Sequence, residues 1–109
     1  MSAPRTKSRW YSVRCIFQAT DRHAYEERIT LWLTESIDAA IREAELEAAA
    51  YGRGSGFVYT GLAQAYDLKS TQITSGSEAF SLIRSSDLEP NDYIDRFFDT
   101  GAEFQQCDD

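Results

Sequence analysis

The sequence predicts an α+β fold with the order ββαββα, in which helices cover one face of a four-stranded, mainly antiparallel sheet. Two neighbouring segments alternate apolar and polar residues with the period of strands, and the next segment has the period of a helix. The chain has 109 residues, of which 42% are hydrophobic, enough for one core. We therefore predict a single domain over residues 9–103, preceded by a disordered arm (1–8) and followed by an acidic tail (104–109).

The first two strands are predicted to form a hairpin. Between residues 10 and 19 the odd positions are apolar from Tyr11 onward and the even ones mostly polar, which is typical of a half-buried strand. Residues 25–33 repeat this pattern, and the polar stretch TDRHA separates the two segments. If the apolar faces coincide, paired residue numbers sum to 44, Cys15 lies opposite Ile29, and the loop holds about five residues.

Residues 36–52 have the pattern of an amphipathic helix. Ser36 is a suitable N-cap, and Gly52 can supply the left-handed conformation that ends a helix. The apolar residues between them step by four and three positions and so share one helical face: Ile37, Ile41, Ala44, Ala48 and Tyr51. We expect this face to pack against the sheet.

The second half of the chain predicts two more strands and a short helix. Residues 57–68 begin with aromatic and β-branched residues and continue with small ones on one side, and residues 78–84 predict a fourth strand. Pro90 fits the first turn of a helix that ends before Gly101. The apolar side of this helix consists of Tyr93, Ile94, Phe97 and Phe98.

The sheet face without helices is predicted to carry two tryptophans among polar residues. In the register above, Trp10 and Trp32 lie on this face together with Arg14 and Arg28. Aromatic residues and arginine are enriched in protein interfaces, so these four residues are candidate contacts for self-association or for another protein. The alternative is that the N-terminal arm or a loop covers the two indole rings.

Negative charge is concentrated toward the C-terminus. The chain has 11 Lys and Arg against 18 Asp and Glu, and from residue 87 onward eight acids accompany only Arg96. An acidic helix suits a basic protein partner, for which Asp92 and Asp95 are candidate contacts. The alternative is that the acids only solvate the surface. Nucleic-acid binding is not expected, because it depends on neutralisation of phosphates by Lys and Arg.

A different class of function is a small-ligand site or a minor enzyme. Its predicted polar group is Arg14 or Glu27, and Glu27 falls on the predicted core face, where a carboxylate needs a partner. The remainder of this candidate pocket is lined by four tyrosines, Tyr11, Tyr25, Tyr59 and Tyr66.

No catalytic residue, metal site or cofactor is predicted. His23 is the only histidine and falls in the polar turn, whereas Cys15 points into the predicted core, so the two do not form a nucleophile and base. Cys15 and Cys107 lack the short spacing of zinc ligands. No apolar run approaches the ~20 residues of a membrane span and no signal peptide is recognised, so we expect a cytoplasmic protein without membrane contact.

Several segments together resemble a small bacterial family, the domain of unknown function numbered 4288. These segments are WYSVRCIF (10–17), YEERITLW (25–32), the Ala-rich helix that ends at Tyr51, YTGLAQAY (59–66) and FSLIRSSDLEPNDYIDRFFDTGAE (80–103). The resemblance covers nearly the whole chain and implies a compact bacterial α+β protein, but it brings no catalytic or binding residues. The chain is more loosely similar to small acidic immunity proteins that neutralise bacterial toxins, an analogy at the level of the fold.

These observations favour a cytoplasmic, non-catalytic protein–protein interaction module that self-associates, for example as a homodimer, with an immunity-protein-like role as one form of it. The alternative is the small-ligand-binding protein or minor enzyme with a tyrosine-lined pocket.

Overall fold

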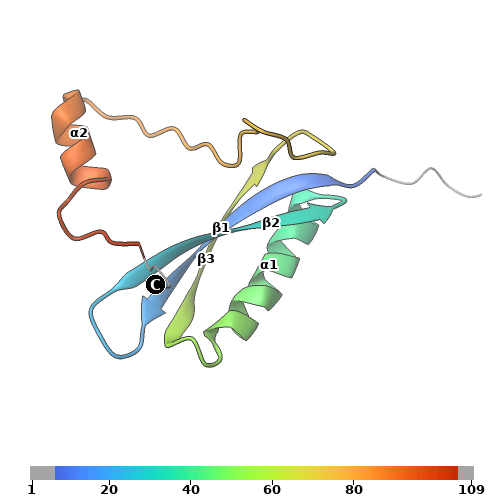
Figure 1. Ribbon diagram of the computed structural model, residues 1–109, viewed down its shortest axis with the longest axis horizontal. Coiled ribbons are helices and arrows are strands. Elements are labelled where there is room, and N and C mark those ends of the chain that lie inside the picture. The colour runs from blue at the N-terminus through green and yellow to red at the C-terminus, as the bar shows by residue number, and fades with distance from the viewer. Residues whose placement is uncertain (1–6, 106–109) are drawn as a thin grey trace, which may run out of the picture.

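The computed structural model describes residues 7–105, which contain three strands and two helices. In chain order these are β1 (Arg9–Ala19), β2 (Tyr25–Thr34), α1 (Ile37–Gly52), β3 (Phe57–Asp67) and α2 (Pro90–Phe97). The strands form one antiparallel sheet in the order β2-β1-β3, with α1 against one face (Figure 1). The predicted α+β class is confirmed, but the sheet has three strands rather than four.

The central strand β1 supplies most of the core. Its odd-numbered residues from Tyr11 to Ala19 are all buried, as the alternation predicts. The buried positions of α1 that face them are all alanines, namely Ala40, Ala44 and Ala48. Because alanine is small, the helix lies close to the strand, and Phe17 fills the space beside it by contacting the rings of Tyr51 and Tyr59.

Helix α1 begins as predicted and ends differently. The Ser36 hydroxyl oxygen accepts a hydrogen bond of 3.1 Å from the backbone N–H of Ala39, which confirms the N-cap. Gly52 is the last helical residue and does not adopt the predicted left-handed conformation. A Cβ atom at Gly52 would lie 3.1 Å from the Phe57 carbonyl oxygen, so glycine is favoured there by the close approach of the next strand.

The register of the first hairpin differs by one residue from the predicted one. Cys15 lies opposite Arg28 rather than Ile29, so that paired residue numbers sum to 43. A slip of one residue moves every side chain of β2 to the other face of the sheet. The prediction was wrong because it assumed that both apolar faces join one core. Helix α1 lies mainly over β3, and the side chains that β2 turns toward it are Glu26, Arg28, Thr30 and Trp32 rather than the aliphatic residues.

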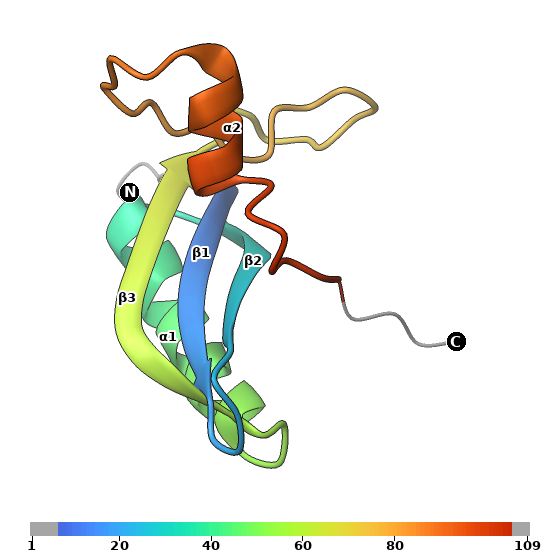
Figure 2. The ribbon, with the colours of Figure 1, turned by 90° about the vertical axis from the view of Figure 1, so that its left-hand side faces the viewer.

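The sheet therefore has two unlike faces. The helix-covered face holds the odd residues of β1 and the even residues of β2, whereas the open face holds the even residues of β1 and the odd residues of β2. Figure 2 shows the three strands side by side, with α1 behind them. On β3, an irregularity around Gly61, whose φ is +94°, shifts the pairing with β1 by two residues, so that Ala63 and Ala65 lie under α1 like Tyr59 and Leu62 stays on the open face.

Residues 78–84 do not form the predicted fourth strand. The apolar residues of this segment do not alternate strictly, since Leu82 and Ile83 are adjacent and Ile83 is 92% exposed. Only Phe80 makes a ring contact with the sheet, through Tyr66, among the aromatic pairs of residues 7–105. The segment is thus attached by side chains rather than by a backbone ladder.

Residues 68–105, which we call the C-terminal arm, extend away from the sheet. The arm leaves the end of β3, carries α2 at a distance from the strands, and returns toward the first hairpin (Figure 1). The Cα radius of gyration is 16.8 Å, compared with about 13 Å for a compact chain of this length. Helix α2 confirms the predicted short helix, but it does not lie with α1 on one face of the sheet.

The predicted ends of the chain lie partly outside the described residues. Of the N-terminal arm (1–8) only Lys7 and Ser8 are described, and both are exposed. Of the acidic tail (104–109) only Phe104 and Gln105 are described.

Candidate interaction surface

The open face presents a row of uncovered apolar side chains on β2. We call this row the β2 stripe; it consists of Tyr25, Ile29, Leu31 and Leu33. Leu31 is 44% exposed and Leu33 52% exposed. Val58 and Leu62 of β3 extend the exposed apolar surface on the same face. Contiguous exposed apolar surface of this kind marks interaction sites in proteins.

The other half of the open face is already covered by the chain itself. Phe80 of the arm packs on Tyr66, with ring centroids 6.0 Å apart, and its ring lies 4.9 Å from the Arg14 guanidinium. The Arg14 guanidinium also donates to Gln64 at 2.5 Å and lies 3.5 Å from Glu27. The arm therefore covers the Arg14 and Tyr66 part of β1 and β3, whereas the β2 stripe and the side chains of Val58 and Leu62 stay exposed.

Ser12 lies in this covered half, between Leu31 and Tyr66 in the sheet. It is fully buried, and its hydroxyl has no hydrogen-bond partner within residues 7–105. An unpaired buried hydroxyl destabilises a fold.

Polar side chains close the helix-covered face at its β2 edge. The Arg28 guanidinium donates to Glu47 at 2.5 Å and lies 3.9 Å from the ring centre of Tyr51. The Tyr51 hydroxyl donates to Glu26 at 2.7 Å. Trp32 packs against the core, and its indole N–H donates to Thr30. Arg28 and Trp32 therefore do not share a face with Trp10 and Arg14, which corrects the predicted grouping.

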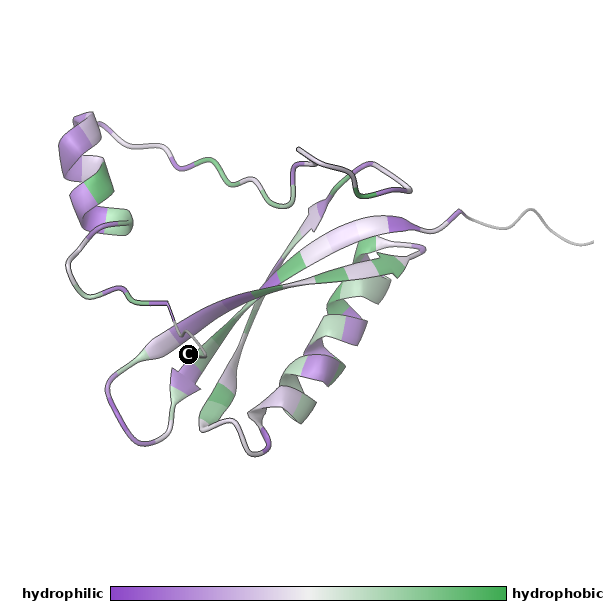
Figure 3. Cartoon of the chain, in the orientation of Figure 1, coloured by the Kyte–Doolittle hydropathy of each residue, from purple (hydrophilic) through white to green (hydrophobic). Residues whose placement is uncertain are grey.

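Helix α2 is amphipathic and its apolar side is uncovered. Tyr93 contacts the rings of Phe97 and Phe98 at 4.8 and 5.8 Å, and Arg84 lies 4.8 Å from the Phe97 ring centre. Ile94, Phe97 and Phe98 all remain substantially exposed. Figure 3 shows hydrophobic and hydrophilic residues together on α2. The predicted contacts Asp92 and Asp95 are exposed on this helix, away from the tryptophans of the sheet.

The tyrosines of the predicted ligand pocket are distributed over both faces. Tyr11 is buried in the core, and Tyr59 lies on the same helix-covered face, where its hydroxyl donates to Glu45 at 2.7 Å. Tyr25 and Tyr66 lie on the open face, at its opposite ends. Glu27 is also on the open face and not on the core face where the sequence placed it. The five residues do not line one cavity.

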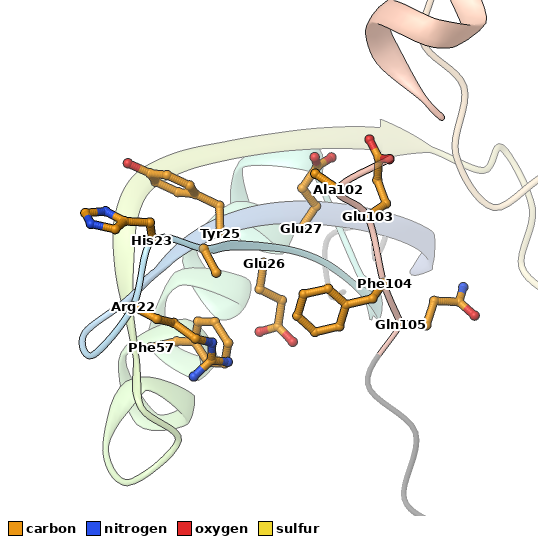
Figure 4. Close-up of a pocket in the computed structure, with 11 residues that line it drawn as sticks. Arg22, His23, Tyr25, Glu26, Glu27, Phe57, Ala102, Glu103, Phe104 and Gln105 are labelled. Carbon is orange, nitrogen blue, oxygen red and sulfur yellow. The ribbon is translucent and has the colours of Figure 1, made fainter. Parts of the chain in front are cut away.

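An open groove of about 760 Å³ lies instead between the first hairpin and the end of the arm. Residues 22–27 and Phe57 line one side of it, and residues 102–105 line the other. Figure 4 shows that Phe104 lies on the same side of β2 as Glu26 and Phe57, whereas Tyr25 and Glu27 lie on the other side. The groove thus follows the outer edge of β2 and includes Tyr25 and Glu27 of the predicted ligand set.

The titratable groups next to the core favour their neutral forms. Burial raises the pKa of the Cys15 thiol. Burial, together with the hydrogen bond to Glu45, raises the pKa of Tyr59 strongly. His23 lies exposed in the hairpin turn. A protonated, buried thiol and a distant histidine do not make a nucleophile and base.

Residues 7–105 hold neither a metal-ligand cluster nor a membrane-spanning helix. Residues 7–105 contain no cluster of three or more His, Cys, Asp or Glu side chains suited to a metal ion. No helix in this range has the length and apolar character needed to cross a bilayer.

Comparisons with known proteins add no relative. No protein-family model, no curated protein and no solved structure matches this chain. The resemblance to the bacterial family numbered 4288 therefore stays a prediction from the sequence.

Sequence reasoning missed the β2 stripe as a surface, because it assigned Ile29, Leu31 and Leu33 to the core. A signal was present in α1, whose buried positions are alanines. A helix whose fully buried residues are all alanines has a narrow apolar face and covers less of a three-stranded sheet than a helix with large apolar residues does. The polar residues Glu26 and Arg28, matched by Glu47 and Tyr51, complete this signal.

Proposed function

We propose that this chain is a non-catalytic protein–protein interaction module that self-associates through the β2 stripe. The observation that carries the proposal is the row of apolar side chains on β2, which stay 44–66% exposed while the arm contacts only Arg14 and Tyr66 on the same face through Phe80. The uncovered apolar side of α2 supports the same proposal. An immunity-protein-like role and a cytoplasmic location are extensions of this proposal that rest on the sequence.

A protein partner fits this surface better than the other classes do. The stripe is an exposed row of apolar side chains on one strand, whereas sites for small molecules are concave and bury most of their ligand. The chain carries a net charge of −7, which disfavours nucleic acid. Exposed apolar surface of this kind is what another protein buries.

Sedimentation equilibrium of the parent protein and of the double variant Ile29→Glu/Leu31→Glu tests the proposal. Both positions are exposed, so the substitutions leave the core intact, while two carboxylates in a buried interface lack partners. The matched control is Leu46→Glu on the outer side of α1, where Leu46 is 74% exposed. We expect the parent and the control to self-associate and the double variant to remain monomeric; equal behaviour of all three proteins would reject the proposal.

The second candidate is binding of a small molecule in the groove at the β2 edge. Its supporting observation is the combination of Arg22, His23 and Glu26 with the aromatic rings of Phe57 and Phe104 around one groove. Native mass spectrometry of protein purified from its host tests this candidate. A stoichiometric added mass that disappears in Phe104→Ser supports it, and a bare chain mass counts against it.

A further inference from the structure

We infer that helix α2 of one copy docks on the β2 stripe of a second copy, and that the second copy returns the same contact. This exchange of arms rests on the proposed self-association and names its geometry. It is carried by the two uncovered apolar surfaces of the chain, one on β2 and one on α2.

Helix α2 needs a partner to be stable. It spans eight residues, Pro90–Phe97, and isolated helices shorter than about 12 residues are marginal in water. Its N-cap residue, Glu89, makes no side-chain capping bond to the helix. Within the described part of the chain α2 lies apart from the sheet (Figure 1), so its own domain supplies little packing. A second molecule that covers Ile94 and Phe98 would supply the missing stabilisation.

The surface available is sufficient for a stable dimer. Ten large apolar side chains of β2, β3 and residues 83–98 are at least 40% exposed: Tyr25, Ile29, Leu31, Leu33, Val58, Leu62, Ile83, Ile94, Phe97 and Phe98. At about 60–120 Å² for each fully exposed side chain, they hold on the order of 500 Å² of apolar surface per copy. Since apolar atoms make up about 57% of an interface, burial of this surface implies about 900 Å² per copy. A stable complex buries about 800 Å² per partner.

Charge favours a contact between α2 and the hairpin over contacts between like parts. Residues 87–103 carry six acids and only Arg96, whereas residues 7–34 carry five basic residues and three acids. Two arms placed against each other would repel, while an arm placed against a hairpin is attracted. Within the sheet, Arg14 lies directly opposite Ile29, and its guanidinium is 3.5 Å from the carboxylate of Glu27 on the same face.

Reciprocal docking also closes the assembly. If each copy gives α2 and receives α2, both apolar surfaces of both chains are covered in a two-fold dimer, and no unpaired site is left for a third copy. Docking in one direction only would leave one stripe and one helix uncovered.

Mixing two full-length variants tests the exchange. The face variant is Ile29→Glu/Leu31→Glu, the arm variant is Ile94→Glu/Phe98→Glu, and Leu46→Glu is the control. The proposed dimer has two contacts, each between α2 of one copy and the β2 stripe of the other. A homodimer of either variant loses both contacts, so we expect its self-association to weaken by at least about a hundredfold. The mixture retains one intact contact, between α2 of the face variant and the β2 stripe of the arm variant. We therefore expect heterodimers to form although neither variant dimerises alone.

Native mass spectrometry detects these heterodimers by mass, and far-UV circular dichroism verifies that each variant is folded. Suppose that the parent dimerises and the arm variant dimerises equally well. The two β2 stripes then pair with each other. In that case the exchange of α2 is wrong, but the proposed self-association is still supported. The same conclusion follows if both variants are monomeric and the mixture forms no heterodimer. If the folded parent is monomeric, both the exchange and the proposed self-association fail.

Discussion

The two faces of the sheet bury their apolar residues in different ways. On the helix-covered face, α1 covers β1 with alanines, and the edge is sealed by Arg28 with Glu47 and by Tyr51 with Glu26. On the open face, the β2 stripe has no cover from residues 7–105 beyond the neighbouring strands. The difference teaches that α1 buries the apolar residues of one face within the chain, whereas the apolar residues of β2 on the other face stay exposed.

The largest loss of stability is expected from a substitution in the core of the helix-covered face. Phe17 is fully buried and contacts both Tyr51 and Tyr59. We expect Phe17→Ala to lower the free energy of unfolding by about 3–5 kcal/mol, through lost burial and the cavity that remains. Urea unfolding monitored by circular dichroism measures this change. A loss below about 1 kcal/mol would show that this face is not the core.

Alkaline pH should also lower the stability of the fold, through two groups on the helix-covered face. The pKa values of Cys15 and Tyr59 are raised above 9.0 and 10.0, their ordinary values, mainly by burial. Their contribution to stability is therefore complete below about pH 9 and is lost as the pH rises toward their folded-state pKa values, because the unfolded chain releases these protons first. Urea unfolding at a series of pH values should show this decline. In Tyr59→Phe, the decline should be shallower, and an unchanged pH profile would count against Tyr59 as a contributor.

Substitutions at the polar edge of the helix-covered face are expected to lower the free energy of unfolding by less. Arg28→Met keeps the aliphatic stem and removes the guanidinium that contacts Glu47 and the Tyr51 ring. Both charged side chains are partly exposed, so we expect a loss of about 1 kcal/mol. The matched control is Arg22→Met, whose ion pair with Asp21 lies in the exposed hairpin turn. Equal urea midpoints for the two variants would contradict the sealing role of Arg28.

The smallest effect on the isolated chain is expected on the open face. Leu33 is 52% exposed, and Leu33→Thr keeps a residue that favours strands. In the dissociated monomer we expect the free energy of unfolding to change by no more than about 0.5 kcal/mol. The same substitution should weaken self-association, which analytical ultracentrifugation measures. A large loss of monomer stability would mean that Leu33 belongs to the core after all.

The sequence predicted where the strands and helices lie more reliably than it predicted which face of each strand is buried. Alternation in β1 and the three-and-four spacing in α1 reflect burial of those elements within one chain. The buried face of β1 was predicted correctly, and that of α1 in part, since Ala44 and Ala48 are buried but Ile37 is exposed. The same alternation in β2 has a different cause, because Ile29 and Leu31 face away from α1. A periodic pattern shows that two faces differ, but not which face meets the helix.

The candidate surface was predicted only in part for the same reason. Trp10 and Arg14 do lie on the open face, whereas Trp32 and Arg28 moved to the helix-covered face with the shift in register. The fourth strand at 78–84 was predicted from apolar content, but Phe80 holds this segment through its ring. Long-range contacts of this kind leave no local period in the sequence.

The two tryptophans allow a direct test, because they lie on opposite faces of the sheet. Trp32→Phe leaves Trp10 as the reporter of the open face, beside Leu33, and Trp10→Phe leaves Trp32 as the reporter of the helix-covered face. Tryptophan fluorescence of each variant is recorded during serial dilution from the concentration at which the protein self-associates. Burial of the open face by a second copy predicts that the Trp10 emission moves to longer wavelength on dilution while the Trp32 emission stays constant. Trp10 emission that is independent of concentration would contradict it.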